Sequence, residues 1–245
     1  MSDRRPRQRP RLHAPAQKPA LTPQQTTLWD YPSQHYGDRH QGSQSYRGAT
    51  PSYVIWNVLQ HWSQAGDMVL DPFCGSGTTL DVAKDLDRRA VGFDLAPFHR
   101  QVERADARDL PLDDASIDVV FMDPPYADNL EYSDDPRCIG KLRGDGPYQR
   151  AMSEVFDEMA RVTRTGGVLA IYVCDVQERK HGFHPLGFQL WELASKHFLA
   201  IEACAVVRRN KNLQAGTHRR AAEEGGFLLR GFNHLIVMER RRTKA

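Results

Sequence analysis

Short apolar segments that alternate with helix-patterned segments constrain this chain more than any other feature. Strands that are joined through helices pair in parallel by right-handed crossovers, which predicts one open sheet covered on both faces. The last two strands have no helix between them and are therefore predicted to form an antiparallel pair. The predicted strands are 68–73, 89–95, 117–122, 168–174, 199–208 and 232–239, and the predicted helices are 51–62, 78–86, 148–162 and 185–197.

The length and composition predict a single hydrophobic core. The chain has 245 residues, of which 40% are apolar, enough for one sizeable domain but hardly for two. We expect residues 1–45 to form a basic, largely disordered tail and arm, whose second half packs through its aromatic residues, and residues 46–245 to form a single domain. No apolar run approaches the roughly 20 residues needed to span a bilayer, and no secretory signal is visible, so we expect a cytoplasmic protein.

Cysteine usage and charge exclude some classes of protein. The four cysteines lie far apart without a C-x-x-C pair, which argues against a disulfide framework or a cysteine zinc site. His181 and His184 have no third ligand nearby in the sequence, so no metal is expected. The formal net charge is only +2, but residues 208–220 carry five basic residues and no acid.

A glycine turn follows the first of the predicted core strands. The segment 71–79 reads DPFCGSGTT and leads into a helix, where backbone can approach a ligand closely and the helix N-terminus offers free N–H groups. Asp94 ends the next strand about 20 residues later, the position at which an acid binds ribose hydroxyls in doubly wound folds. Leu80 replaces the third glycine of the pyrophosphate-binding pattern, so a nucleoside ligand without phosphates suits this loop better than NAD.

A second motif follows the apolar strand at 117–122. Asp123, Pro124, Pro125 and Tyr126 stand at its carboxyl end, where ligands bind in open parallel sheets. A carboxylate and a backbone carbonyl that accept the two N–H bonds of a base amino group would localise its lone pair for attack. The prolines fix that carbonyl, and the tyrosine ring offers a surface on which an extruded base can stack.

These two motifs resemble those of the bacterial DNA amino-methyltransferase family, which modifies cytosine N4 or adenine N6. The resemblance implies a Rossmann-like methyltransferase fold, with a mostly parallel seven-stranded sheet and an antiparallel last strand, and S-adenosylmethionine as the cofactor. The catalytic residues would be Asp123, Pro124, Pro125 and Tyr126. The cofactor would contact Thr50, Pro51, Asp71, Pro72, Phe73, Gly75, Ser76, Gly77, Thr78, Asp94, Asp106 and Asp123.

A flipped-out base requires a cationic surface around the pocket. We expect double-stranded DNA to be bound there, and a short site read by a possible homodimer, since the chain has no room for a separate recognition region. A cognate restriction endonuclease is a possible functional partner, and the enzyme would be associated with the nucleoid. The expected DNA-binding residues are Lys141, Arg143, Arg208, Arg209, Lys211, Arg219 and Arg220.

The residues leave the acceptor open. Cytosine N4 is the first hypothesis, but serine is common in place of Asp123 among the cytosine enzymes, so adenine N6 is the second. An RNA guanine-N2 methyltransferase and a non-enzymatic nucleic-acid-binding protein are further alternatives. Methylation of cytosine carbon 5 is excluded because the chain has no Pro-Cys nucleophile, and Cys74 is interpreted as a packed residue of the cofactor loop.

Overall fold

A computed structural model describes residues 21–31, 33–46, 48–126, 133–142, 145–178, 182–208 and 216–242. In this part of the chain the main sheet has eight strands in the order β1-β9-β10-β6-β5-β2-β3-β4. They are β1 (Leu28–Trp29), β2 (Met68–Asp71), β3 (Arg89–Asp94), β4 (Glu103–Arg104), β5 (Ile117–Met122), β6 (Thr163–Val173), β9 (Phe198–Val207) and β10 (Phe232–Arg240). The remaining elements are the hairpin β7 (Val176–Glu178) and β8 (Gly182–His184), the helices α1 (Ser52–Trp62), α2 (Thr78–Asp85), α3 (Asp145–Val162), α4 (Leu186–Ala194) and α5 (Gly216–Gly225), and the 3-10 helix η1 (Ile139–Lys141).

The strand pairing confirms the predicted α/β class. Strands β2, β3, β4, β5 and β6 run parallel to one another, and β10 is antiparallel to both β6 and β9. The sheet has one strand more than the seven expected, because β1 pairs with the edge strand β9 through Leu28 and Trp29. This strand was not predicted, since two residues are too few to show a pattern.

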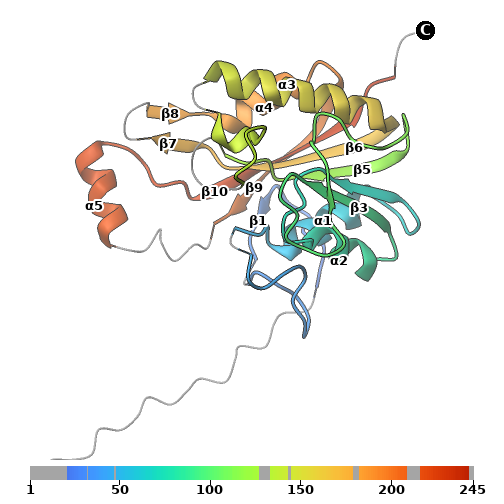
Figure 1. The fold of residues 1–245 in the computed structure, drawn as a ribbon. Coiled ribbons are helices and arrows are strands. Elements are labelled where there is room, and N and C mark those ends of the chain that lie inside the picture. Colours follow the sequence, from blue (N-terminus) through green and yellow to red (C-terminus); the bar gives the residue numbers. More distant parts are fainter. Residues whose placement is uncertain are drawn as a thin grey trace, which may run out of the picture.

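Helices cover both faces of the sheet (Figure 1). On one face α3 and α4 bury Met152, Phe156 and Leu190 against the strands. On the other face α1 and α2 bury Val54, Val82 and their neighbours. Both helical layers are amphipathic, so burial of their apolar stripes supplies the main stabilisation of the fold. No helix in the described part of the chain is both long and apolar enough to span a membrane.

The described part of the predicted arm packs on the sheet edge and on α1. Trp29 is 1% exposed, stacks on Trp62 with ring centroids 6.3 Å apart, and donates from Nε1 to the carbonyl of Thr26 at 2.8 Å. Tyr31 stacks on Tyr53 with 5.2 Å between ring centroids. These contacts confirm that the aromatic half of the arm is packed, while residues 1–20 lie outside the described residues.

The structure differs from the prediction where helix α3 meets strand β6. Helix α3 ends at Val162 as predicted, but β6 begins at once at Thr163, whereas that strand was expected to begin at 168, after the glycines 166 and 167. These glycines lie inside the strand instead. A Cβ atom on Gly167 would come within 2.9 Å of the Asp118 carbonyl, so the close approach of β5 and β6 requires glycine there.

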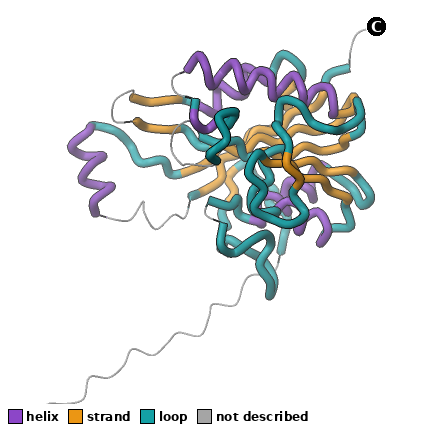
Figure 2. Tube along the Cα trace, in the orientation of Figure 1, coloured by secondary structure: helices purple, strands orange, loops and turns teal. Residues whose placement is uncertain are grey.

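The parallel strands β2 to β6 have their carboxyl ends on one side of the sheet. The hairpin β7–β8 follows β6 and helix α5 follows β9, and both project away from the sheet (Figure 2). Neither the hairpin nor α5 was predicted. The Arg230 guanidinium lies 4.9 Å from the ring centroid of Phe183, which joins the segment after α5 to the hairpin.

The arm should contribute to global stability through Trp29. We expect Trp29→Ala to lower the free energy of unfolding by roughly 3–5 kcal/mol, because a large buried ring is replaced by a cavity. Leu28→Ala is the matched control, since Leu28 is 60% exposed. Urea unfolding followed by fluorescence measures both, and similar small losses for the two variants would show that the arm is not part of the folded core.

Candidate active site

A cavity of about 910 Å³ opens at the carboxyl ends of the strands and collects the predicted catalytic and cofactor-binding residues. Of the predicted residues, Gly77 alone does not line it. The lining includes Thr50, Pro51, Asp71, Pro72, Phe73, Gly75, Ser76, Thr78, Asp94, Asp106, Asp123, Pro124, Pro125 and Tyr126.

The glycine loop adopts a backbone conformation that depends on its glycines. Gly75 and Gly77 have φ values of +34° and +78°, and Gly77 is the residue from which α2 begins. The left-handed conformation favours glycine at both positions. The Gly75 N–H donates to Asp94 Oδ2 at 2.9 Å, and the Ala96 N–H donates to Asp94 Oδ1 at 2.9 Å. The acid at the end of β3 is thereby fixed beside the loop.

Asp71 is hydrogen-bonded to the same loop. Its Oδ1 accepts the Phe73 N–H at 3.0 Å and its Oδ2 accepts the Thr79 hydroxyl at 2.5 Å. Burial raises the pKa of Asp71 to about 7, although both hydrogen bonds oppose that rise. Because both carboxylate oxygens bond to the loop and to the first turn of α2, the direct role of Asp71 is to shape the loop. Thr79 stands in the predicted motif but was not among the predicted site residues.

Asp123 is the half-buried carboxylate at the end of β5. Its Oδ2 accepts the Thr50 hydroxyl at 2.5 Å, and its Oδ1 accepts the Tyr126 hydroxyl at 2.9 Å. Burial raises the pKa of Asp123 to about 6, whereas these two hydrogen bonds and the charge of Arg208 lower it. The Tyr148 hydroxyl donates to the Pro125 carbonyl at 3.1 Å, which holds the proline pair in place.

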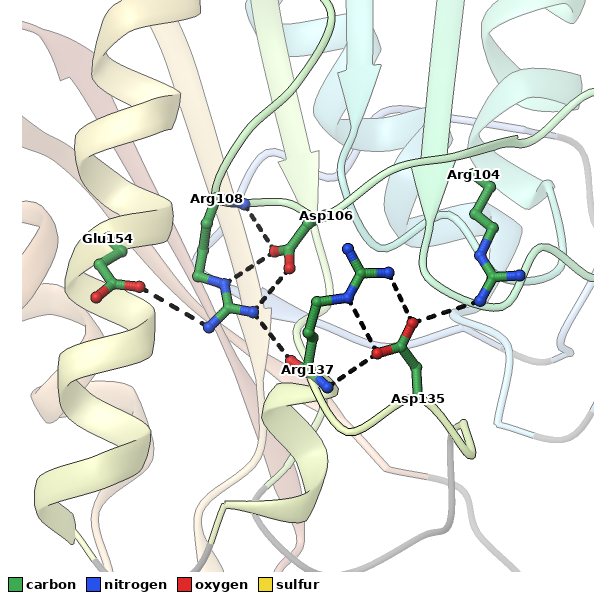
Figure 3. Close-up of polar contacts among 6 residues, drawn as sticks. All are labelled: Arg104, Asp106, Arg108, Asp135, Arg137 and Glu154. Atoms are coloured by element: carbon green, nitrogen blue, oxygen red, sulfur yellow. Dashed lines mark hydrogen bonds and ion pairs between the residues drawn. The ribbon is translucent and has the colours of Figure 1, made fainter.

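Asp106 lines the cavity with its carboxylate already engaged. Arg108 donates to it from Nε at 2.9 Å and from Nη2 at 2.7 Å, and the Arg108 backbone N–H adds a bond of 3.1 Å. Burial opposes ionisation, but the bonds from Arg108 lower the pKa of Asp106. Figure 3 shows how Arg108 also reaches the Arg137 carbonyl, while Arg137 pairs with Asp135. Asp106 is therefore an ionised acceptor inside a rigid charged network.

The residues predicted to bind DNA are separated by the structure. Arg208 lines the cavity, whereas Arg219 and Arg220 are exposed on α5 and Lys141 is exposed in η1. Arg143, Arg209 and Lys211 lie outside the described residues, as does His181. In the described ranges no group of three or more His, Cys, Asp or Glu side chains is arranged to hold a metal ion.

The sequence interpretation missed one wall of the cavity. Tyr172, Cys174 and Asn233 line it from β6, the residue after β6, and β10. Each belongs to a strand that was predicted, but no motif marks them. Burial raises the pKa of the Cys74 thiol, so Cys74 remains protonated in the loop, as its interpretation as a packed residue expects.

Comparison with known proteins supports the resemblance. A family model described as DNA methylase, of the N6 and N4 type, matches residues 4–103, which include the glycine loop and Asp94 but end before Asp123. The type II methyltransferase M2.DpnII of Streptococcus pneumoniae is 41% identical over 22% of this chain and 20% of its own length. M.BamHI of Bacillus amyloliquefaciens is 34% identical over 38% of this chain and 22% of its own. A tRNA (guanine(10)-N2)-dimethyltransferase of Methanothermobacter thermautotrophicus is 40% identical over 26% and 23%.

These matches span about a fifth to a quarter of the relatives' own lengths. Solved structures extend the similarity at the level of fold. Geranyl diphosphate C-methyltransferase from Streptomyces coelicolor A3(2) superposes with a TM-score of 0.53, at 13% identity, over 78% of this chain and 76% of that one. TrmN from Thermus thermophilus gives 0.51 at 17% identity, over 79% and 50%. The chain thus has the fold found in these methyltransferases, and its residues 4–103 are similar to the DNA methylase family.

Proposed function

We propose that this protein transfers a methyl group from S-adenosylmethionine to an exocyclic amino group of a base in double-stranded DNA, with cytosine N4 as the acceptor. The observation that supports this most is the opening of Asp123 and the glycine loop into one cavity. A carboxylate able to hold an amino group therefore faces the same space as a nucleoside-binding loop.

The cofactor end of the cavity fits a nucleoside without phosphates. Gly75 and Gly77 leave backbone exposed at the start of α2, and the Asp94 oxygens keep lone pairs that can accept ribose hydroxyls after accepting one N–H each. Asp106 offers a further ionised oxygen at the adenine end. When bound, S-adenosylmethionine supplies an electrophilic methyl group on a positively charged sulfur.

The acceptor end holds the amino group. Asp123 accepts one amino N–H and the Pro124 carbonyl accepts the other, so the nitrogen lone pair is directed at the methyl carbon. The bound cofactor would supply the methyl group, with its sulfur as the leaving group, and Asp123 or solvent would take the proton released by the amino nitrogen. Tyr126 now occupies Asp123 Oδ1 through its hydroxyl, so the incoming amino group shares or replaces this contact while the ring packs on the base.

Exposed cations near this end of the sheet can neutralise DNA phosphates. Arg219 and Arg220 on α5 and Lys141 in η1 are exposed. Base extrusion is required because a stacked amino group cannot reach the cavity. Two related type II methyltransferases support DNA as the substrate. A homodimer, a partner restriction endonuclease and a cytoplasmic, nucleoid-associated location remain proposals that follow from this activity.

RNA is the second candidate substrate. The tRNA (guanine(10)-N2)-dimethyltransferase is as similar over its matched segment as the type II enzymes are over theirs. Incubation of the protein with labelled cofactor and either plasmid DNA or total RNA separates the two. Digestion to nucleosides and mass spectrometry then identifies the acceptor, and N6-methyladenine or N2-methylguanine as the sole product would refute cytosine N4.

Asp123→Asn should reduce methyl transfer by roughly 100-fold or more, because it removes the charged acceptor of the amino proton. In the unaltered protein the rate should fall as pH drops through about 6, the pKa of Asp123. Protonation removes the negative charge with which the carboxylate accepts the amino N–H of the base. Asp113→Asn, in an exposed turn before β5, is the matched control. Steady-state rates between pH 5 and 8 measure this, and full activity of Asp123→Asn would contradict it.

Thr50→Val should raise the pKa of Asp123 above about 6, because the hydroxyl bond favours the ionised carboxylate and burial then acts with less opposition. Thr50→Ser keeps the hydroxyl and should leave the pKa near that of the unaltered protein. NMR titration of carboxyl-labelled aspartate reports the value directly. An equal pKa in all three proteins would show that Thr50 does not hold Asp123 in solution.

A further inference from the structure

The half of the cavity beyond Asp123 is walled by three neighbouring strands. Tyr172 of β6 lies opposite Leu235 of β10, and Asn233 of β10 lies opposite Val206 of β9. Alternate residues of a strand point to the same face, so Tyr172, Asn233 and Arg208 share one face of the sheet. All three line the cavity.

Asp123 lies on this same face. Phe121, two residues earlier in β5, packs in the core cluster that also contains Tyr172. Burial and then the negative charge of Asp123 raise the pKa of Tyr172, whereas the charge of Arg208 lowers it. The Asp123 carboxylate and the Arg208 guanidinium are therefore both close enough to act on Tyr172, and all three residues line the same cavity.

The Arg208 side chain has donors to spare. A guanidinium carries five N–H donors and no acceptor. Within the described ranges, one side-chain bond is found, from Nη1 to Cys174 Sγ at 2.9 Å, and sulfur is a weak acceptor. A half-buried guanidinium with this environment is suited to a ligand with strong acceptor atoms.

Asn233 adds a second unsatisfied group. The residue is 6% exposed, and its Oδ1 has no hydrogen-bond partner among the residues that the structure describes. Buried polar groups in native proteins are nearly always paired, so an orphan on a cavity wall points to a ligand. The amide can accept through oxygen or, rotated by 180°, donate through nitrogen.

We propose that Arg208 and Asn233 read the ring edge of the target base and thereby select cytosine; this rests on the proposed function. With its amino group on Asp123, cytosine presents two acceptors along the same edge, N3 and O2, which match the fork of a guanidinium. Adenine presents one acceptor, N1, followed by a C–H group. Guanine presents an N–H donor beside its amino group, which a cation cannot accept.

The test uses a duplex oligonucleotide with the site mapped from methylated plasmid DNA. Arg208→Ala should lower kcat/KM for cytosine roughly 10- to 100-fold, the loss expected for one bidentate base contact. Arg208→Lys keeps the charge without the fork and should recover only part of the activity. Asn233→Ala should show a smaller loss. Arg241→Ala, an exposed residue after β10, is the matched control, and calorimetry with S-adenosylhomocysteine should give the same affinity for all variants.

A second substrate isolates the contact. Replacing the target cytosine with 3-deazacytosine removes the N3 acceptor, so it should impair the unaltered protein but impair Arg208→Ala little further. Full kcat/KM in Arg208→Ala, or equal losses on 3-deazacytosine with and without Arg208, would overturn the inference while leaving the methyltransferase assignment intact. Failure of the unaltered protein to methylate any nucleic acid would instead refute the proposed function.

Discussion

Parallel pairing of β2, β3, β5 and β6 decides where the chemically active side chains lie. Each of these strands delivers its carboxyl end to the same edge of the sheet, so Asp71, Asp94 and Asp123 meet although they are far apart in the sequence. The antiparallel strand β10, inserted between β6 and β9, extends that edge beyond Asp123. The extension supplies part of the cavity wall through Asn233, which a sheet ending at β6 would lack.

This arrangement buries several carboxylates partly, which disfavours their ionised forms. Burial raises the pKa of Asp71 and of Asp123, and the charges of Asp123 and Asp94 raise that of Asp71 further. Hydrogen bonds from Thr79, Phe73, Thr50 and Tyr126 offset part of this cost. Such locally unfavourable groups are typical of functional sites, where the fold supplies the stability that the site lacks.

Local sequence patterns predicted the main strands and the two motifs, because both depend on residues that are close together in the sequence. The apolar strand at 117–122 and the helix around Met152 follow from periodicity, and the loop at Gly75 follows from composition. The cavity wall formed by β6 and β10 could not be predicted in this way. Asn233 and Tyr172 are brought together by strand register, which depends on long-range pairing.

The position of Arg208 was also not predictable from local sequence patterns. Its charge run suggested a DNA-binding surface, but its position at the end of β9 turns the side chain into the cavity. Charge runs report composition, whereas burial depends on the face of the strand from which a residue projects. Strand β1 escaped prediction because the arm owes its order to packing of Trp29 on Trp62, a tertiary contact that a two-residue strand does not signal.

The account depends on one cavity that holds the cofactor and a flipped-out base on either side of Asp123. The most direct measurement is a crystal structure of the protein with S-adenosylhomocysteine and a duplex containing its mapped site. The account predicts the adenosine moiety beside Asp94 and the amino nitrogen of an extruded cytosine within roughly 3 Å of the Asp123 carboxylate. A base that remains stacked in the duplex, or an amino group held away from Asp123, would contradict it.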